Sequence, residues 1–280
     1  MEPRTLESLL LKRHKTVYQT PTLPKMIWNI DPVAFEIFGW PVRWYGIIYL
    51  VGFFIVQHFG WRILSQNSNH PLTRPQWEDA CFYTFLFGII GGRLGEFLFY
   101  SPRTFWTHPI EIIKIWQGGL SMHGGFLGAL IALYFWSQKQ KRSVITIFDA
   151  LVVPLSAVIG LGRIANFING EIVGIPTNTN WGVVFPHVDE LLRHPVQLYE
   201  SASMFLLCSI LYGFWKYIPL KKGTLTQAFL VGYGVFRFVV EFWKESPGYI
   251  AGFKTGQVLC FIMILVGLVW KIVDQKTNGK

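Results

Sequence analysis

Seven stretches of the 280-residue sequence are each long and apolar enough to cross a lipid bilayer as a helix. A backbone inside hydrocarbon must satisfy its own hydrogen bonds, so only helices and closed barrels cross a membrane. Runs of about 20 apolar residues fit helices. The predicted spans are residues 44–64, 80–100, 120–137, 144–167, 199–215, 225–243 and 257–273. The sequence therefore predicts an all-α polytopic integral membrane protein with about seven transmembrane helices.

The composition supports this class and argues against a soluble nucleic-acid-binding protein. Hydrophobic residues make up 51% and charged residues 15% of the chain, whereas soluble domains carry about 25% charged residues. The net charge of +9 is explained by anionic lipid and basic cytoplasmic loops, so we expect no nucleic-acid partner. Cys81, Cys208 and Cys260 lie in apolar runs without metal-ligand spacing. We therefore expect no metal and no cofactor.

Lysine and arginine residues are distributed unevenly over the predicted loops. With the N-terminus outside, the cytoplasmic loops and the C-terminal end hold eleven of them, against five in the opposite loops. This bias favours an outside N-terminus and a cytoplasmic C-terminus, although six further basic residues precede or open the first span and offset the margin. The long connection from Asn169 to Gln197 carries three prolines and can hold small structured elements outside the bilayer.

A dense group of polar residues lies at the end of the fourth span, within residues 162–174. It consists of Arg163, Asn166, Asn169 and Glu171. Arginine at membrane depth costs a few kcal/mol or more and usually marks a functional site. Glycines at positions 170 and 174 predict a helix break that offers main-chain N–H groups to an anion. The competing interpretation is a capped helix end with an arginine that reaches to the membrane surface.

Three arginines lie beyond the midpoints of even-numbered spans, at Arg93, Arg163 and Arg237. Even-numbered spans run in the same direction, so we expect the three guanidinium groups near one face of the membrane. His123 and Tyr45 lie near the starts of the third and first spans, which run the other way and begin at that same face. An outside N-terminus makes this face the outer leaflet.

Helical spacing predicts two ion pairs within this group. Arg237 and Glu241 are four residues apart, and Arg93 and Glu96 are three apart. Both pairs can be purely structural. Tyr233 lies one turn before Arg237 on the same helical face, which favours a functional role for that arginine.

Residues 162–174 closely resemble the signature of the bacterial prolipoprotein diacylglyceryl transferases. Further stretches resembling the family are residues 44–46, 118–125, 194–200 and 233–242, and the resemblance begins near Trp28. One departure is Lys244, where the family usually has arginine. The resemblance divides the chain into a basic N-terminal tail (1–27), a seven-span transferase domain (28–273) and a cytoplasmic C-terminal tail (274–280). The segment before the first span, to about residue 41, is expected to be a tail.

This resemblance implies a reaction in the bacterial plasma (inner) membrane, with the active site toward the outer leaflet. A diacylglyceryl group passes from phosphatidylglycerol to the lipobox cysteine of a prolipoprotein signal peptide, forming a thioether and releasing glycerol phosphate. The implied catalytic residues are His123, Arg163 and Arg237. The implied phosphatidylglycerol-binding residues are Arg163, Asn166, Asn169, Glu171, Gly174, Tyr45, Tyr233, Glu241 and Arg93.

The residue types suit this chemistry. Arginine binds phosphate through two parallel hydrogen bonds and stays charged at any relevant pH. His123 is a candidate base for the cysteine thiol, and a nearby arginine that lowers the thiol pKa is the alternative. A transporter or channel for an anionic solute also places arginine in membrane spans, and a non-catalytic assembly factor is a third possibility. Transporters often have internal repeats, but the single faint echo of residues 92–97 in residues 162–167 does not establish a repeat architecture.

Overall fold

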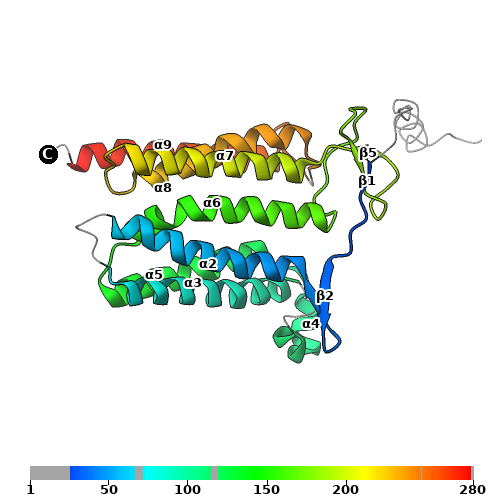
Figure 1. The fold of residues 1–280 in the computed structure, drawn as a ribbon, viewed down its shortest axis with the longest axis horizontal. Helices are drawn as coiled ribbons and strands as arrows, with labels where there is room; N and C mark the ends of the chain where they lie inside the picture. The colour runs from blue at the N-terminus through cyan, green and yellow to red at the C-terminus, as the bar shows by residue number, and fades with distance from the viewer. Residues whose placement is uncertain (1–25, 67–71, 115–118, 247, 279–280) are drawn as a thin grey trace, which may run out of the picture.

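Long helices dominate the computed structural model, which describes residues 26–66, 72–114, 119–246 and 248–278. They run side by side (Figure 1) and comprise α2 (Trp44–Ser65), α3 (Arg74–Gly95), α5 (Met122–Gln140), α6 (Val144–Ile168), α7 (Val196–Tyr217), α8 (Thr224–Val240) and α9 (Thr255–Asn278). Five are long and apolar enough to cross a membrane: α2, α3 with its extension to Tyr100, α6, α7, and α8 with its extension to Trp243. The prediction of a polytopic membrane protein is confirmed at this level.

The helices pack as neighbours in a bundle. Helix α2 packs on α6, which also contacts α7 and α8, while α8 packs on α9 and α3 on α5. The main apolar core lies between these helices and includes Trp77, Leu133, Ile147, Leu207 and Leu211, all nearly fully buried. Burial of such side chains against their neighbours, rather than helix propensity, sets the order of the helices.

Glycines determine how closely α3 and α5 approach. A Cβ atom added at Gly91 would lie 2.4 Å from the carbonyl oxygen of Gly124, and one at Gly124 would lie 2.3 Å from that of Gly91. Small residues at such spacing let membrane helices pack backbone to backbone. Ser121 starts α5, because its hydroxyl accepts a hydrogen bond from the main-chain N–H of Gly124 at 3.2 Å. The glycines after His123 therefore serve this helix contact.

Small elements cover one end of the bundle, where the expected fold was all-α. Strands β1 (Met26–Ile27), β4 (Val183–Val184) and β5 (Leu192–Arg193) form one sheet, with β1 parallel to β4 and β4 antiparallel to β5. Strands β2 (Val33–Ile37) and β3 (Trp40–Arg43) form an antiparallel hairpin. Figure 1 shows β1, β2, β5 and α4 (Pro102–Thr107) at the same end of the helices. The prediction that the connection after α6 holds small structured elements is confirmed.

The segment before the first span is more than a tail in its described part. Residues 1–25 lie outside the described residues, but β1 pairs with β4, and Trp28 donates its main-chain N–H to the carbonyl oxygen of Val184 at 2.9 Å. The Trp28 ring packs 4.3 Å from that of Phe167 at the end of α6. At the other end of the chain, α9 continues through Asn278, beyond the predicted span boundary at residue 273.

Candidate functional site

Three helices each contribute one charged side chain to a buried ion cluster. Arg163 on α6 places Nε 2.6 Å from Oε2 of Glu200 on α7. Arg237 on α8 pairs through Nη1 with the other carboxylate oxygen of Glu200. Relative exposures of these side chains are 15% for Arg163, 5% for Glu200 and 17% for Arg237. The structure thus brings together two of the three arginines that were expected at one face.

The segment that follows α8 adds two more charges to this cluster. Arg237 Nη2 lies 3.0 Å from Oε2 of Glu241, which confirms the predicted pair four residues apart. Lys244 Nζ lies 3.2 Å from Oε1 of Glu200. Burial, together with the positive charges of Arg237 and Arg163, lowers the pKa of Lys244 to about 7. With Lys244 protonated, three cations face two carboxylates, and the cluster keeps one excess positive charge.

A chain of polar contacts leads from Arg163 to the start of α2. Arg163 Nη1 donates to Oδ1 of Asn166 at 3.1 Å, and the two residues are three apart on one face of α6. Asn166 Nδ2 donates to the hydroxyl of Tyr45. The Tyr45 hydroxyl in turn donates to Oε2 of Glu171 at 3.2 Å. Tyr45 and Arg163 therefore belong to one connected network, although they lie far apart in sequence.

Two amide side chains at this end of the network keep acceptor oxygens without a donor. Asn169 donates through Nδ2 to Oε1 of Glu171 at 3.0 Å, and Gln197 donates through Nε2 to the main-chain oxygen of Glu171 at 2.6 Å. These acceptors fix which way each amide points. Asn169 Oδ1 and Gln197 Oε1 are then left buried without a hydrogen-bond partner among the described residues. Unpaired buried acceptors are uncommon in folded proteins and usually receive a hydrogen bond from a bound water molecule or a ligand.

A shallow cleft opens beside the ion cluster, with enclosed room for about one water molecule. Its lining combines the charged groups with apolar side chains: Ile159, Arg163, Glu200, Ser203, Met204, Tyr233 and Arg237. The arrangement places cationic groups next to apolar surface, which suits a ligand that has an anionic group and an apolar body.

The connection after α6 fastens the end of α6 to the end of α8. Gly174 forms an isolated antiparallel bridge with Lys244, and Ile175 donates its N–H to the main-chain oxygen of Trp243 at 2.9 Å. Arg193 supports this contact, because Nη1 donates to the carbonyl oxygen of Gly174 at 2.8 Å and pairs with Glu245 at 2.6 Å. A Cβ at Gly174 would lie 2.5 Å from the His194 oxygen. Gly174 thus permits close main-chain packing under the cluster.

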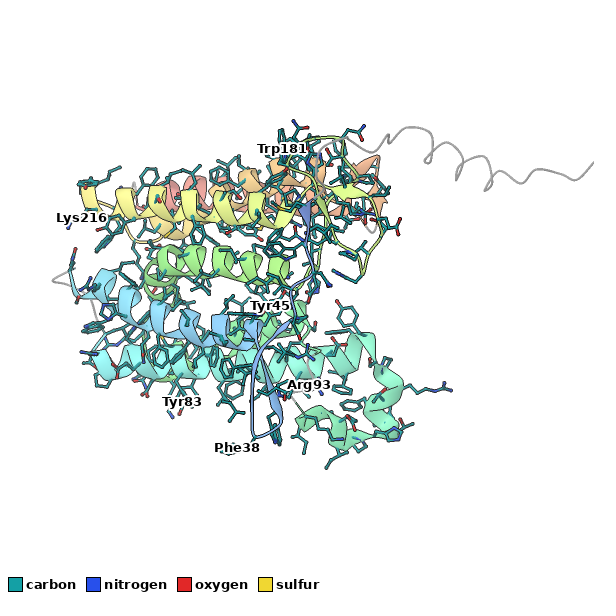
Figure 2. All side chains as sticks on the ribbon, turned by 45° about the vertical axis from the view of Figure 1, so that its right-hand side comes forward. Phe38, Tyr45, Tyr83, Arg93, Trp181 and Lys216 are labelled. Carbon is teal, nitrogen blue, oxygen red and sulfur yellow. The ribbon has the colours of Figure 1, made fainter. Side chains whose placement is uncertain are left out.

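Arg93 occupies a different environment from Arg163 and Arg237. Its guanidinium donates to the main-chain oxygens of Glu111, Ile112, Lys114 and Gly119 at 2.6–3.0 Å. The side chain is buried and lies 4.8 Å from the centre of the Phe97 ring. These contacts tie the segment after α3 to the helix. Figure 2 shows Arg93 and Tyr45 toward the same end of the bundle, with Lys216 at the other end.

His123 lies at the start of α5 and is exposed. Its Nδ1 atom is 3.3 Å from the hydroxyl of Tyr100, at the end of the extension of α3. Among the described hydrogen bonds and ion pairs, those of His123 do not reach Arg163 or Arg237. The expected convergence therefore holds for the groups on α2, α6 and α8, while His123 and Arg93 belong to the α3–α5 part of the bundle.

Glu200 is the central residue of the cluster and was not among the predicted site residues. Its carboxylate is shared by Arg163, Arg237 and Lys244. A signal was present in the sequence, because Glu200 is an acidic residue at the start of an apolar span, where a partner is required. The pairing across three helices depends on long-range packing, which spacing along one helix does not reveal.

Comparison with known proteins agrees with the geometry. The sequence profile of the family described as "Prolipoprotein diacylglyceryl transferase" matches residues 32–273. A protein of Nitrosomonas europaea named phosphatidylglycerol–prolipoprotein diacylglyceryl transferase is 43% identical over 259 residues, covering 90% of this chain and 92% of the relative. Proteins of the same name from Methylobacillus flagellatus and Bordetella parapertussis are 41% and 38% identical, covering 88% and 85% of this chain and 96% and 93% of the relatives.

Proposed function

The chain belongs to the prolipoprotein diacylglyceryl transferase family, and we propose that the cluster of Arg163, Glu200 and Arg237 is its reaction centre. The chain is a transferase that acts in lipoprotein biosynthesis. The donor is phosphatidylglycerol and the acceptor is a prolipoprotein, as the names of its relatives state. The acceptor atom in this proposal is the thiol sulfur of the lipobox cysteine.

The observation that carries the proposal is the sharing of one carboxylate by two arginines beside an apolar cleft. Each guanidinium keeps N–H donors beyond those used by Glu200. The cluster also has one positive charge in excess when Lys244 is protonated. A phosphodiester supplies one negative charge and several acceptor oxygens, so it would neutralise the excess and bind both guanidinium groups.

The reaction follows from this placement. The cysteine thiolate attacks the carbon of the diacylated glycerol unit that carries the phosphate ester. A C–S bond forms there as the C–O bond to the phosphate breaks. The bonding electrons leave with the phosphate oxygen, and glycerol phosphate departs. Negative charge grows on that oxygen during the step, and the two arginines are placed to stabilise it. Their charge also favours the thiolate over the thiol, whose ordinary pKa is about 8.5.

His123 is our candidate for the group that accepts the thiol proton. A neutral histidine can act as a base only through the nitrogen that carries no proton. The contact between Nδ1 and the Tyr100 hydroxyl allows this if Nδ1–H donates to the tyrosine oxygen, because Nε2 then keeps its lone pair. The route by which an arginine alone lowers the thiol pKa remains the alternative. A His123→Gln variant that keeps the wild-type pH–rate profile would favour that alternative.

The remaining predicted residues take supporting roles in this proposal. Tyr45, Asn166 and Glu171 orient Arg163 and the head group. The unpaired oxygens of Asn169 and Gln197 accept hydrogen bonds from the hydroxyls of the glycerol head group. Tyr233 lines the acyl side of the cleft, and Glu241 holds Arg237. Gly174 and Arg93 act through main-chain packing.

We also propose the full topology on the basis of the helix order. In this proposal α5 and α9 cross the membrane as well, giving seven spans with the N-terminus outside and the C-terminus in the cytoplasm. The cluster then faces the outer leaflet of the bacterial inner membrane. A cysteine introduced at Asn178 should react with an impermeant thiol reagent added to intact cells, and one at Lys141 should not. The reverse labelling pattern would refute this orientation.

The direct test of the function uses purified protein with phosphatidylglycerol and a signal peptide that carries a lipobox cysteine. Mass spectrometry should detect a peptide with a diacylglyceryl thioether and free glycerol phosphate. The matched control is the same peptide with serine in place of the cysteine, which should remain unmodified. Release of glycerol phosphate without any modified peptide would contradict transfer to the thiol.

A further inference from the structure

The hairpin formed by β2 and β3 has one apolar face whose side chains are about half exposed. Cross-strand pairs join Phe35 to Val42 and Ile37 to Trp40, so these four side chains share a face. Glu36 and Pro41 pair on the opposite face. Phe35 and Ile37 remain about half exposed, at 50% and 49%. An isolated two-stranded hairpin with an exposed apolar face is marginally stable in water, so an apolar surrounding for Phe35 and Ile37 would stabilise it.

The tip of the hairpin presents the most exposed aromatic side chain. Phe38 is 100% exposed and has a φ of +51°, followed by Gly39 at +80°. Positive φ angles at both turn residues match the twist of a tight hairpin and fix where the tip projects. A fully exposed phenylalanine ring is poorly placed in water and well placed in an apolar surrounding.

The position of the hairpin along the chain fixes its distance from the membrane. Strand β3 ends at Arg43, and the 22-residue helix α2 begins at Trp44 without a linker. A helix of that length spans about 33 Å, roughly the thickness of the hydrocarbon core. The N–H of Trp44 also donates to the carbonyl oxygen of Pro32 at 3.2 Å, which returns the base of β2 to the same level. Both strands therefore start at the membrane surface.

The direction of the hairpin relative to the helices shows where its tip lies. The hairpin runs across the helix ends rather than along the helices (Figure 1), and Figure 2 shows Phe38 beyond the edge of the bundle. The same end carries α4 and the short helix of residues 109–113, where Trp106 is 80% exposed and Ile110 and Ile113 are exposed as well. A segment that runs along the membrane surface and extends beyond the bundle lies over lipid.

We propose that the β2–β3 hairpin is a membrane-interface anchor whose apolar face and Phe38 tip insert among the lipids of the leaflet that faces this end of the bundle. Strand β3 continues directly into α2, which crosses the membrane, so the apolar face of the hairpin lies at the depth of the lipid head groups. Lipid is therefore the partner in this proposal. Aromatic side chains are favoured at that depth. The anchor holds the first turn of α2, and with it Tyr45, at the level of the lipid phosphates. The anchor requires only that α2 crosses the membrane, and its effect on Tyr45 rests on the proposed function.

The test measures the surroundings of the tip directly and needs no enzymatic activity. A Phe38→Cys variant, in a background with Cys81, Cys208 and Cys260 replaced by alanine, is labelled with an environment-sensitive fluorophore and reconstituted in vesicles of phosphatidylglycerol and phosphatidylethanolamine. Lipids carrying a nitroxide near the head group should quench the label strongly, and aqueous iodide should quench it weakly. The control is a label at Asn178→Cys, because Asn178 is exposed in the connection after α6. Iodide should quench this label strongly, and the nitroxide lipids should quench it weakly.

A second labelled position keeps the proposal testable if the first variant folds poorly. A Trp106→Cys label should also be quenched by the nitroxide lipids. Strong iodide quenching at Phe38→Cys in folded protein would overturn the anchor. Protection from iodide that appears only after a lipoprotein signal peptide is added would also overturn it, because the partner would then be a peptide.

Discussion

The pattern Gly-Arg-x-x-x-Phe occurs at residues 92–97 in the α3 region and 162–167 in α6, yet the two arginines have different partners. Arg93 donates to four main-chain oxygens and lies over the Phe97 ring. Arg163 bonds to the side chains of Glu200 and Asn166. Around Arg93 the helices meet through glycines, and around Arg163 they meet through charges.

In the proposed function, the difference between the two regions separates Arg93, held by main-chain oxygens, from Arg163, which belongs to the reaction centre. Four main-chain oxygens accept the hydrogen bonds of Arg93 and hold its guanidinium in a fixed geometry. A ligand anion would have to displace these oxygens in order to bind Arg93. A carboxylate shared by two arginines balances only part of their charge, so an anion can bind without displacing it. Local sequence is nearly the same in both regions, and the partners that tertiary packing brings decide the role.

Loss of the charge on Glu200 should give the largest effect, because only the Arg163 region depends on a shared carboxylate. In Glu200→Gln, Arg163, Arg237 and Lys244 lose their common counter-charge. We expect a loss of about 3–5 kcal/mol in the free energy of unfolding, measured by thermal unfolding in detergent. Glu245→Gln is the matched control, since Glu245 is 52% exposed where it pairs with Arg193, and its loss should stay below about 1 kcal/mol. Equal losses would contradict the central role of Glu200.

The exchange of arginine for lysine compares the two regions directly. Arg163→Lys keeps the charge but cannot reach both Glu200 and a phosphate in the same geometry. Loss of a contact made mainly in the transition state should raise the barrier by about 3–4 kcal/mol, or slow transfer about a hundred- to a thousandfold. The measurement is the transferase rate per mole of folded enzyme. A rate near that of the wild type would make Arg237 the main phosphate ligand.

Arg93→Lys is the counterpart in the other region. A lysine has three donors and cannot satisfy the four main-chain oxygens that Arg93 binds. We expect less folded protein, with a loss of about 1–3 kcal/mol in stability, and a nearly normal rate for the molecules that fold. A large fall in rate per folded molecule would show that Arg93 takes part in the chemistry.

Packing of α3 against α5 can be tested with two glycines on the same helix face. Gly91→Ala places a Cβ 2.4 Å from the main-chain oxygen of Gly124, whereas Gly88→Ala places one 3.7 Å from that of Gly125. We expect Gly91→Ala to destabilise the protein by about 1–3 kcal/mol, seen as a lower unfolding temperature. Gly88→Ala should be nearly neutral. Similar losses in both variants would mean that the two helices do not meet at these glycines.

Removal of residues 1–25 should have the smallest effect, because both arginine regions and the hairpin follow this basic segment in the sequence. A chain that begins at residue 26 keeps β1, which pairs with β4. We expect normal insertion and a rate within about twofold of the full chain, since changes away from buried contacts alter stability little. A truncated protein that inserts normally but lacks activity would reveal a role for the tail.

Contacts within one helix were predictable from the sequence. The spacing of Arg237 and Glu241 predicted their pair, because residues four apart share a helical face. The contact between Arg163 and Asn166, three residues apart, follows the same rule. Long apolar runs likewise predicted where the helices lie to within a few residues. Glu200 and Gln197 could not be placed, since their partners come from other helices and from the connection after α6.

The sequence contained a signal for the β2–β3 hairpin that the prediction of a tail overlooked. Residues 33–42 are rich in β-branched and aromatic side chains on both sides of Gly39, a composition typical of two short strands joined by a turn that contains glycine. Their position before the first span led to the expectation of a tail. His123 is the opposite case, because the glycines that follow it pack against α3 whether or not the histidine reacts.

The order of the charges along the chain has a consequence for synthesis. Glu200 lies midway in sequence between Arg163 and Arg237, and helices enter the membrane from the N-terminal end onward as the chain grows. The α6–α7 pair can therefore enter as a neutral unit, with Arg163 matched by Glu200 before α8 has been made. We expect a nascent chain arrested after Tyr217 to integrate both helices, and the same chain with Glu200→Gln to integrate α6 less completely. Glu200 is thus synthesised, and can pair with Arg163, before Arg237 emerges to share its carboxylate.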